Sequence, residues 1–214
     1  MHTPSTRIGA WAGLATAAFF APVALVITEL PDLDSASAVA AFYGRHAGLM
    51  EAILCSVSLG FATFLVFLGA LTERLVAHRA GGWGWVAFGA ALMFMTALSV
   101  ALGIDAAAAL LRDKISAEVI LSVHSTAFLL AAPAAGAGVA FFIAVGAASS
   151  GERGLPAWSG RVATIGAIVN TGALAGFFSL SGVWNSGNGL VGGLAGPVLM
   201  WIIWIVAVSL SWLR

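Results

Sequence analysis

Residues 41–58 read AFYGRHAGLMEAILCSVS, a stretch in which a polar run is followed by the start of a long apolar segment. Tyr43, Arg45 and His46 belong to the polar run, whereas Glu51 and Cys55 lie in the apolar part. An ionisable side chain in or at the edge of a membrane span is costly to bury, so it marks a candidate functional site. The stretch therefore predicts a membrane-spanning helix with polar residues near one end.

The composition of the whole chain indicates a membrane protein. Of its 214 residues, 61% are hydrophobic and 8% are charged, and the mean hydropathy is +1.03. Soluble domains carry about 25% charged residues. Nine basic and nine acidic residues cancel, and no basic cluster occurs, so we expect no nucleic-acid partner. Cys55 is the only cysteine, which excludes an internal disulfide and a cysteine-built metal site.

Six apolar segments are long enough to span a membrane, since about 20 apolar residues cross roughly 30 Å of hydrocarbon. The expected spans are residues 8–29, 48–71, 83–107, 117–147, 161–183 and 189–213. We expect the first span to be retained rather than cleaved as a signal peptide. The predicted fold is all-α, a single membrane domain over residues 1–214 in which the spans form a six-helix bundle.

Residues 35–46 differ from the spans in their pattern. Val39, Phe42 and Tyr43 share one helical face, and Ser35 is a suitable N-cap. This spacing favours a short amphipathic helix that lies on the membrane surface between the first two spans.

Basic residues indicate the orientation of the spans. Three of the nine fall on one side, at Arg45, Arg112 and Lys114. The other six fall on the opposite side: Arg7, Arg74, Arg79, Arg153, Arg161 and Arg214. By the positive-inside rule, the chain is a multipass protein of the cell membrane with both termini in the cytoplasm.

Glycines recur at four-residue spacing in the last two spans. The pairs are Gly172/Gly176, Gly189/Gly193 and Gly192/Gly196. Such spacing lets two helix backbones approach closely. We expect it to pack spans five and six together, and a homodimer face is the alternative.

Helix geometry places four ionisable residues at a similar depth. At ~1.5 Å per residue, 22 residues cover ~33 Å, which is the thickness of the hydrocarbon core. Near the outer ends of spans one to four lie Glu29, Glu51, Asp105 and His124. If these spans bundle, the four side chains could converge on an outward-facing vestibule. They could then act as acid and base or hold a divalent metal. We assign no metal and no cofactor.

These residues also have a structural interpretation. Polar side chains at the ends of spans meet water and headgroups, which accounts for Glu29 and Asp105 without a function. His124 could be a hydrogen-bonded packing residue. Glu51 stands out because the residues before it, 47–50, are already apolar. Haem is disfavoured because no span holds a second histidine to pair with His124.

Further candidate ligand contacts lie elsewhere in the chain. Asn170, near the middle of span five, could bond another helix or a ligand. Trp201 and Trp204 lie at mid-depth in span six, away from the interfaces where tryptophan concentrates, and could line a hydrophobic pocket. The full set of candidate ligand-binding residues is Glu29, Tyr43, Arg45, His46, Asn170, Trp184, Trp201 and Trp204.

Three segments resemble a pattern in small multipass membrane proteins of high-GC bacteria. They read AVAAFYGRH, FLGALTERL and GGWGWVAFGAAL, and the resemblance covers about residues 36–92. The shared pattern is one of composition, and the family has no assigned activity to transfer. The resemblance therefore implies a bacterial multipass membrane protein and no particular reaction.

Three classes of function follow, in order of preference. The first is a membrane protein that binds a lipid-like or other hydrophobic small molecule, or serves as a membrane accessory factor. The second is a membrane-embedded enzyme of cyclase or isomerase type, with Glu51 or Asp105 as acid and His124 as base. The third is a small transporter built from two inverted halves. It is disfavoured because Pro22 and Pro133 interrupt the halves at unlike positions.

Overall fold

The computed structural model describes residues 4–78, 80–149 and 155–214, and within them every regular element is a helix. The elements are α1 (Pro4–Ile27), α2 (Ala36–Ala77), α3 (Trp83–Leu111), α4 (Ala117–Ala148), α5 (Ala157–Ala173), η1 (Leu174–Phe178), η2 (Leu190–Leu199) and α6 (Met200–Leu213). Six of the resulting helical segments are long and apolar enough to cross a membrane. The predicted all-α class with six long apolar helices is confirmed. Arg79 and Arg153, which the orientation argument uses, lie outside the described residues.

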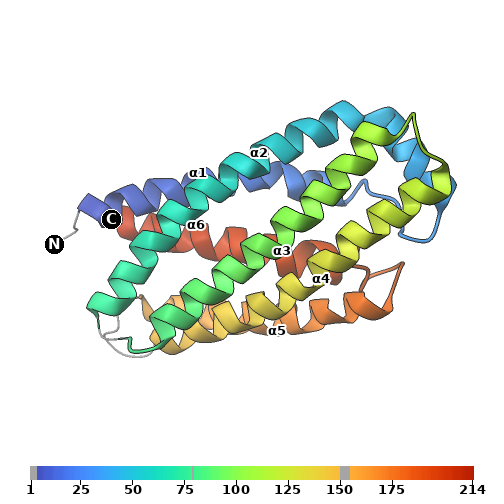
Figure 1. Ribbon diagram of the computed structural model, residues 1–214. Helices are drawn as coiled ribbons and strands as arrows, with labels where there is room; N and C mark the ends of the chain where they lie inside the picture. Colours follow the sequence, from blue (N-terminus) through green and yellow to red (C-terminus); the bar gives the residue numbers. More distant parts are fainter. Residues whose placement is uncertain (1–3, 79, 150–154) are drawn as a thin grey trace.

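The long helices run side by side along the length of the molecule (Figure 1). α1 packs between α2 and α6, α3 packs on α2 and α4, and α4 packs on α5. α1 begins and α6 ends at the same end of the molecule. The α1–α2, α3–α4 and α5–α6 connections lie at the opposite end, which we call the distal end.

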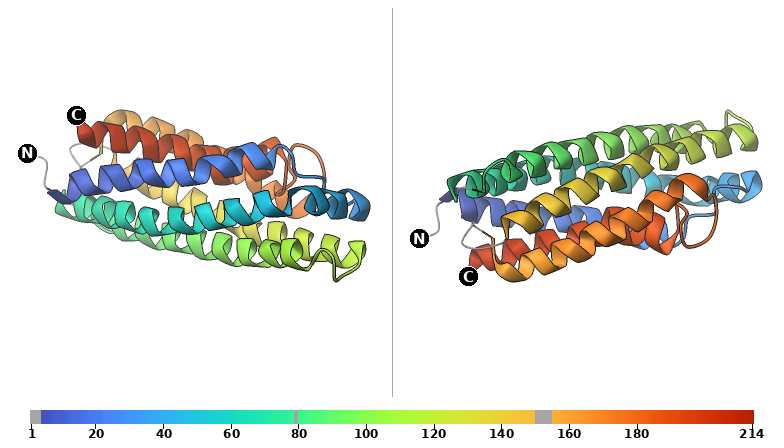
Figure 2. Two further views of the ribbon diagram at one scale, coloured as in Figure 1. Left: turned by 90° about the horizontal axis from the view of Figure 1, so that it is seen from above. Right: turned by 90° about the horizontal axis from the view of Figure 1, so that it is seen from below.

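The separate surface helix predicted for residues 35–46 does not form. Residues 36–77 make one continuous helix of 42 residues, and the Ser35 hydroxyl caps it by accepting a hydrogen bond from the Ala38 amide (3.4 Å). No proline interrupts the stretch, and the face that carries Phe42 and Tyr43 is buried against α1, α3 and α4 rather than against lipid. At ~1.5 Å per residue, α2 is about 63 Å long, twice the hydrocarbon thickness. Figure 2 shows α2 and α3 reaching farther at the distal end than α1 and α6.

Aromatic packing dominates the middle of the molecule. Trp201 stacks between Phe94 and Phe141, with ring centroids 4.1 and 4.4 Å away. Trp204 is fully buried and meets Phe67 and Phe141 edge-on. Offset and edge-on pairs of this kind add to the packing energy beyond the area that they bury.

The last two spans contain irregular helix. α5 continues as the 3₁₀ turn η1, and α6 is preceded by the π-helical η2, in which the amide of Leu194 bonds the carbonyl of Gly189 (3.1 Å). η2 packs on α5, and Gly192 and Gly193 meet the backbone of residues 184–187. The glycine spacing thus serves contacts within one chain, and a homodimer stays a prediction.

Replacing Gly192 with alanine should destabilise the protein, because the added Cβ would overlap the carbonyl oxygens of Trp184 and Asn185. We expect a loss of about 1–3 kcal/mol, which is typical of overpacking. The matched control is Gly69→Ala in α2, where a Cβ meets no heavy atom within 4 Å. Thermal unfolding of both variants in the same lipid or detergent tests this contact. Equal melting temperatures for the two variants would contradict it.

Candidate functional site

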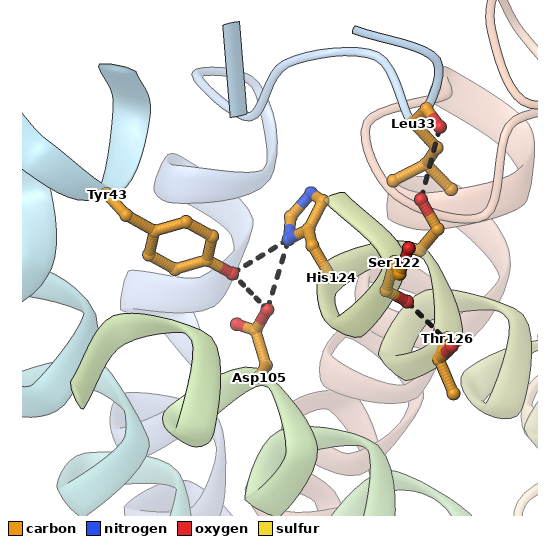
Figure 3. Close-up of polar contacts among 7 residues, drawn as sticks. Leu33, Tyr43, Asp105, Ser122, His124 and Thr126 are labelled. Atoms are coloured by element: carbon orange, nitrogen blue, oxygen red, sulfur yellow. Dashed lines mark hydrogen bonds and ion pairs between the residues drawn. The ribbon is translucent and has the colours of Figure 1, made fainter. Parts of the chain in front are cut away.

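Three polar side chains from three helices meet near the distal end (Figure 3). The Tyr43 hydroxyl donates a hydrogen bond to Oδ1 of Asp105. The same hydroxyl lies 2.7 Å from Nδ1 of His124, which is 3.2 Å from Asp105 Oδ1. Tyr43 and His124 are fully buried and Asp105 is 2% exposed. We call this group the Tyr–Asp–His triad.

The helices bring the triad together through their register. Asp105 lies six residues before the end of α3 at Leu111, and His124 lies seven residues after the start of α4 at Ala117. Because α3 and α4 are antiparallel neighbours joined by a short turn, positions equally far from the turn lie at the same height. Tyr43 lies seven residues after the start of α2, on its buried face.

The hydrogen bonds indicate where the protons lie. Because the Tyr43 hydroxyl donates to Asp105, we assign a ring proton of His124 to Nδ1, where it faces both oxygens without lone-pair repulsion. That leaves Nε2 of His124 buried and without a hydrogen-bond partner among the described residues. The side-chain hydrogen bonds of Asp105 to described residues are both made by Oδ1, which leaves Oδ2 without one.

An apolar cavity of about 90 Å³ adjoins the triad. Helices α1, α2, α3, α4 and η2 contribute its walls, and the only polar side chains among the described lining residues are Asp105 and Ser186. A smaller cavity of about 20 Å³ shares Phe20, Pro197 and Val198 with the first and reaches Trp201. The two cavities are neighbours that share part of their walls, and together their lining residues extend from Asp105 to Trp201.

The surroundings make the triad's polar atoms energetically important. Inside an apolar wall the effective dielectric is low, so satisfied hydrogen bonds are strengthened and unsatisfied groups are costly. Asp105 has one oxygen fixed by Tyr43 and His124, and the residue also belongs to the cavity wall. It can therefore accept a hydrogen bond from, or exchange a proton with, a molecule in the cavity.

Two connections at the distal end contribute Leu30 and Ser186 to the lining of the cavity. The Asn188 amide donates to the Leu30 carbonyl (2.9 Å) and to Asp32 Oδ1 (3.1 Å), which joins the 179–189 connection to the α1–α2 connection. The Ser125 hydroxyl of α4 donates to the Leu33 carbonyl (3.1 Å). These bonds hold the loop that carries Ser186 over the cavity.

Of the four residues predicted to share a depth, the structure brings Asp105 and His124 together and separates the other two. Glu29 and Glu51 are exposed. Met50, directly before Glu51, faces the cavity instead, because successive residues on a helix point about 100° apart. Arg45 is exposed, and His46 is half-buried against the ring of Phe42. A vestibule formed by all four ionisable residues is therefore not present.

The remaining candidate ligand contacts, Asn170, Trp184, Trp201 and Trp204, do not line the cavity next to the triad. Asn170 is buried, and its amide donates to the Gly166 carbonyl of its own helix (2.9 Å). It is not one of the residues that line the cavity. Trp184 is 47% exposed. Trp201 lines the small cavity, whereas Trp204 is part of the aromatic packing.

Sequence reasoning missed Ser186 and Asn188. Their sole signal in the sequence is the presence of polar amide and hydroxyl side chains between two apolar spans. Within the described part of the chain, no group of three or more His, Cys, Asp or Glu side chains could hold a metal ion.

A scan of protein-family models, a search of curated proteins and a search of solved structures each found no match to this chain. The resemblance to multipass proteins of high-GC bacteria therefore stays a prediction. The function has to be argued from the site.

Tyr43→Phe and Asp105→Asn should affect stability in a coupled way. Tyr43→Phe removes the hydroxyl that both partners share, and we expect it to cost about 1–3 kcal/mol because buried polar atoms lose their partner. In the Asp105→Asn background the same change should cost less. Free energies of unfolding for the four proteins give the coupling, which should exceed ~0.5 kcal/mol.

Glu51→Gln is the matched control for this cycle. Glu51 is exposed and does not belong to the triad, so its effect should add to that of Tyr43→Phe within ~0.5 kcal/mol. Additivity between Tyr43→Phe and Asp105→Asn would mean that the triad does not act as one network.

Proposed function

We propose that this chain is a multipass membrane protein that binds a hydrophobic, lipid-like small molecule between its helices. The observation that carries the proposal is the apolar cavity whose wall includes the buried carboxyl group of Asp105. An engineered apolar cavity of about 150 Å³ stays dry and takes up benzene, so a cavity of this kind favours a hydrocarbon group over water.

The location of the cavity supports a ligand that arrives through the bilayer. Its walls come from helices that are long and apolar enough to cross a membrane. A groove of about 300 Å³ between α2 and α3, lined by Cys55, Ser58, Ser99 and Gly103 among others, shares Leu54 and Leu102 with the cavity. A hydrophobic molecule could pass from lipid to the cavity by displacing these two leucine side chains.

A membrane-embedded enzyme of cyclase or isomerase type is the second candidate, and the triad favours it. Asp105 would transfer a proton to or from a substrate in the cavity, and Tyr43 and His124 would hold its carboxyl group in place. Glu51, which is exposed, has no part in this scheme. Uptake of deuterium from D₂O into a retained molecule would favour this candidate over binding alone.

Filling the cavity should abolish ligand retention. Ala101→Leu and Ala127→Leu add side-chain volume from α3 and α4, at positions that are 5% and 2% exposed and line the cavity. Mass spectrometry of the purified protein should find a co-purified hydrophobic molecule in the unmodified protein and at least tenfold less in both variants. The control is Ala52→Leu, on the exposed face of α2, which should retain the molecule.

Size-exclusion profiles show whether the filled variants remain folded. If folded Ala101→Leu and Ala127→Leu proteins both retain as much of the molecule as Ala52→Leu, the ligand lies elsewhere. If the unmodified protein retains no hydrophobic molecule and takes up none that is supplied, the binding proposal is wrong.

We also propose that both termini face the cytoplasm and that the distal end faces outward. The uneven distribution of basic residues supports this orientation. A reporter that is active only in the cytoplasm should give a signal at either terminus, and one that is active only outside should work when inserted at Val183, in the exposed part of the distal connection. Silence of both cytoplasmic fusions would reverse the orientation.

A further inference from the structure

We infer that the ligand carries a neutral hydroxyl group, held by Asp105 and Ser186 at the distal end of the cavity with its hydrocarbon part pointing inward. This inference rests on the proposed ligand-binding function and specifies the class of ligand: an aliphatic or isoprenoid alcohol rather than a fatty acid, a phospholipid or a plain hydrocarbon.

The first observation is the buried hydroxyl of Ser186. Ser186 is 6% exposed and lines the cavity, yet its Oγ has no hydrogen-bond partner among the described residues. Leaving a buried hydroxyl unpaired costs about 1–3 kcal/mol. The backbone around it is fixed, because the Gly187 amide donates to the Asn185 side chain (2.7 Å) and Gly193 of η2 packs against residues 186 and 187. A ligand atom in the cavity could satisfy this hydroxyl.

The second observation is the state of the Asp105 carboxyl group. Tyr43 and His124 both interact with Oδ1, which leaves Oδ2 as a free acceptor on a residue that lines the same cavity. Ser186 adds to the cavity wall a residue whose hydroxyl donor has no partner among the described residues, and Asp105 adds an acceptor. A ligand hydroxyl is both donor and acceptor, so it can bond the two groups together.

Other head groups match these two residues less well. A ligand carboxylate or phosphate has no proton to donate to Asp105 and would bring negative charge close to its carboxyl group, where the low dielectric strengthens repulsion. A hydrocarbon without a polar group leaves both residues unpaired, and sites built to bond a hydroxyl reject analogues that lack it.

The direction of the hydrocarbon part follows from the two cavities. Asp105 and the loop that carries Ser186 lie towards the distal end, whereas the smaller cavity reaches Phe94 and Trp201. Asp105 and Phe94 are 11 residues apart on α3, or about 16 Å along the helix axis. Apart from Asp105 and Ser186, the described lining side chains of the larger cavity are apolar. In the smaller cavity Thr16 and the indole of Trp201 carry the polar atoms, so a tail would meet mostly hydrocarbon along its length.

The test uses three probes with the same chain and different ends: 1-octanol, octanoate and octane. Their uptake is measured with tritium-labelled probes on the full-length protein in lipid nanodiscs, after subtraction of the uptake by protein-free nanodiscs. We expect 1-octanol to bind at least tenfold more tightly than octanoate and octane. Ser186→Ala should weaken 1-octanol binding about tenfold and leave octane binding unchanged.

Ser181→Ala is the matched control, because Ser181 lies in the same connection but is exposed. It should bind 1-octanol as the unmodified protein does. Ser186 makes no side-chain hydrogen bond to lose, and removing an unpaired buried hydroxyl relieves its cost, so the melting temperature of Ser186→Ala without ligand should stay the same or rise. A weaker affinity for 1-octanol in this variant then reports the lost contact with the probe.

The outcomes separate this inference from the binding proposal. Equal affinities for the three probes, or 1-octanol binding that Ser186→Ala does not change, would overturn the hydroxyl head while leaving a hydrophobic site in place. Tighter binding of octanoate would overturn it in favour of an anionic ligand. Absence of binding by all three probes would count against the proposed function as well.

Discussion

The hydrogen bonds among Tyr43, Asp105 and His124 join three helices where the surroundings offer almost no water. A polar group buried in apolar surroundings is stable only while its partners stay in place, so this network fixes how α2, α3 and α4 are rotated about their axes. The same rotation determines which apolar residues face the cavity. It also makes Asp105 part of the cavity wall, with one oxygen left unbonded. The arrangement of the cavity therefore depends on the triad.

The fold could be predicted from the sequence to a large extent, because a bilayer accepts few structures. Every backbone amide and carbonyl group must be bonded within the chain, so a long apolar segment has to be helical. The second span shows that hydropathy alone does not predict where a helix begins. Hydropathy placed its start at residue 48, but the helix begins at Ala36, since Phe42 and Tyr43 pack against other helices. Packing within the protein extends a helix beyond the part that lipid requires.

The candidate site could be predicted only in part. Counting residues along each span gives the depth of a side chain, and this placed Asp105 and His124 at one level. Depth does not give the direction in which a side chain points. The same counting therefore placed Glu51 at this level, although its side chain is exposed and does not belong to the triad. Tyr43 was identified as a candidate contact, but its partners depend on the rotation of three helices. Ser186 lies in a connection whose position is set by Asn188 and by the α1–α2 connection, and no periodic pattern records such contacts.

Selectivity for a hydrophobic ligand is a harder problem in a membrane than in water. Lipid tails are as apolar as the cavity wall, so the transfer of hydrocarbon from bilayer to protein provides little driving force. Shape and the few polar atoms of the wall must then provide the discrimination. Two separate networks hold those atoms in place: the triad fixes Asp105, and the bonds of Asn188 fix the loop of Ser186. Because both networks are already formed in the structure, the proposed binding of a ligand hydroxyl would not have to order these groups, and less of the binding free energy would be lost to immobilising the site.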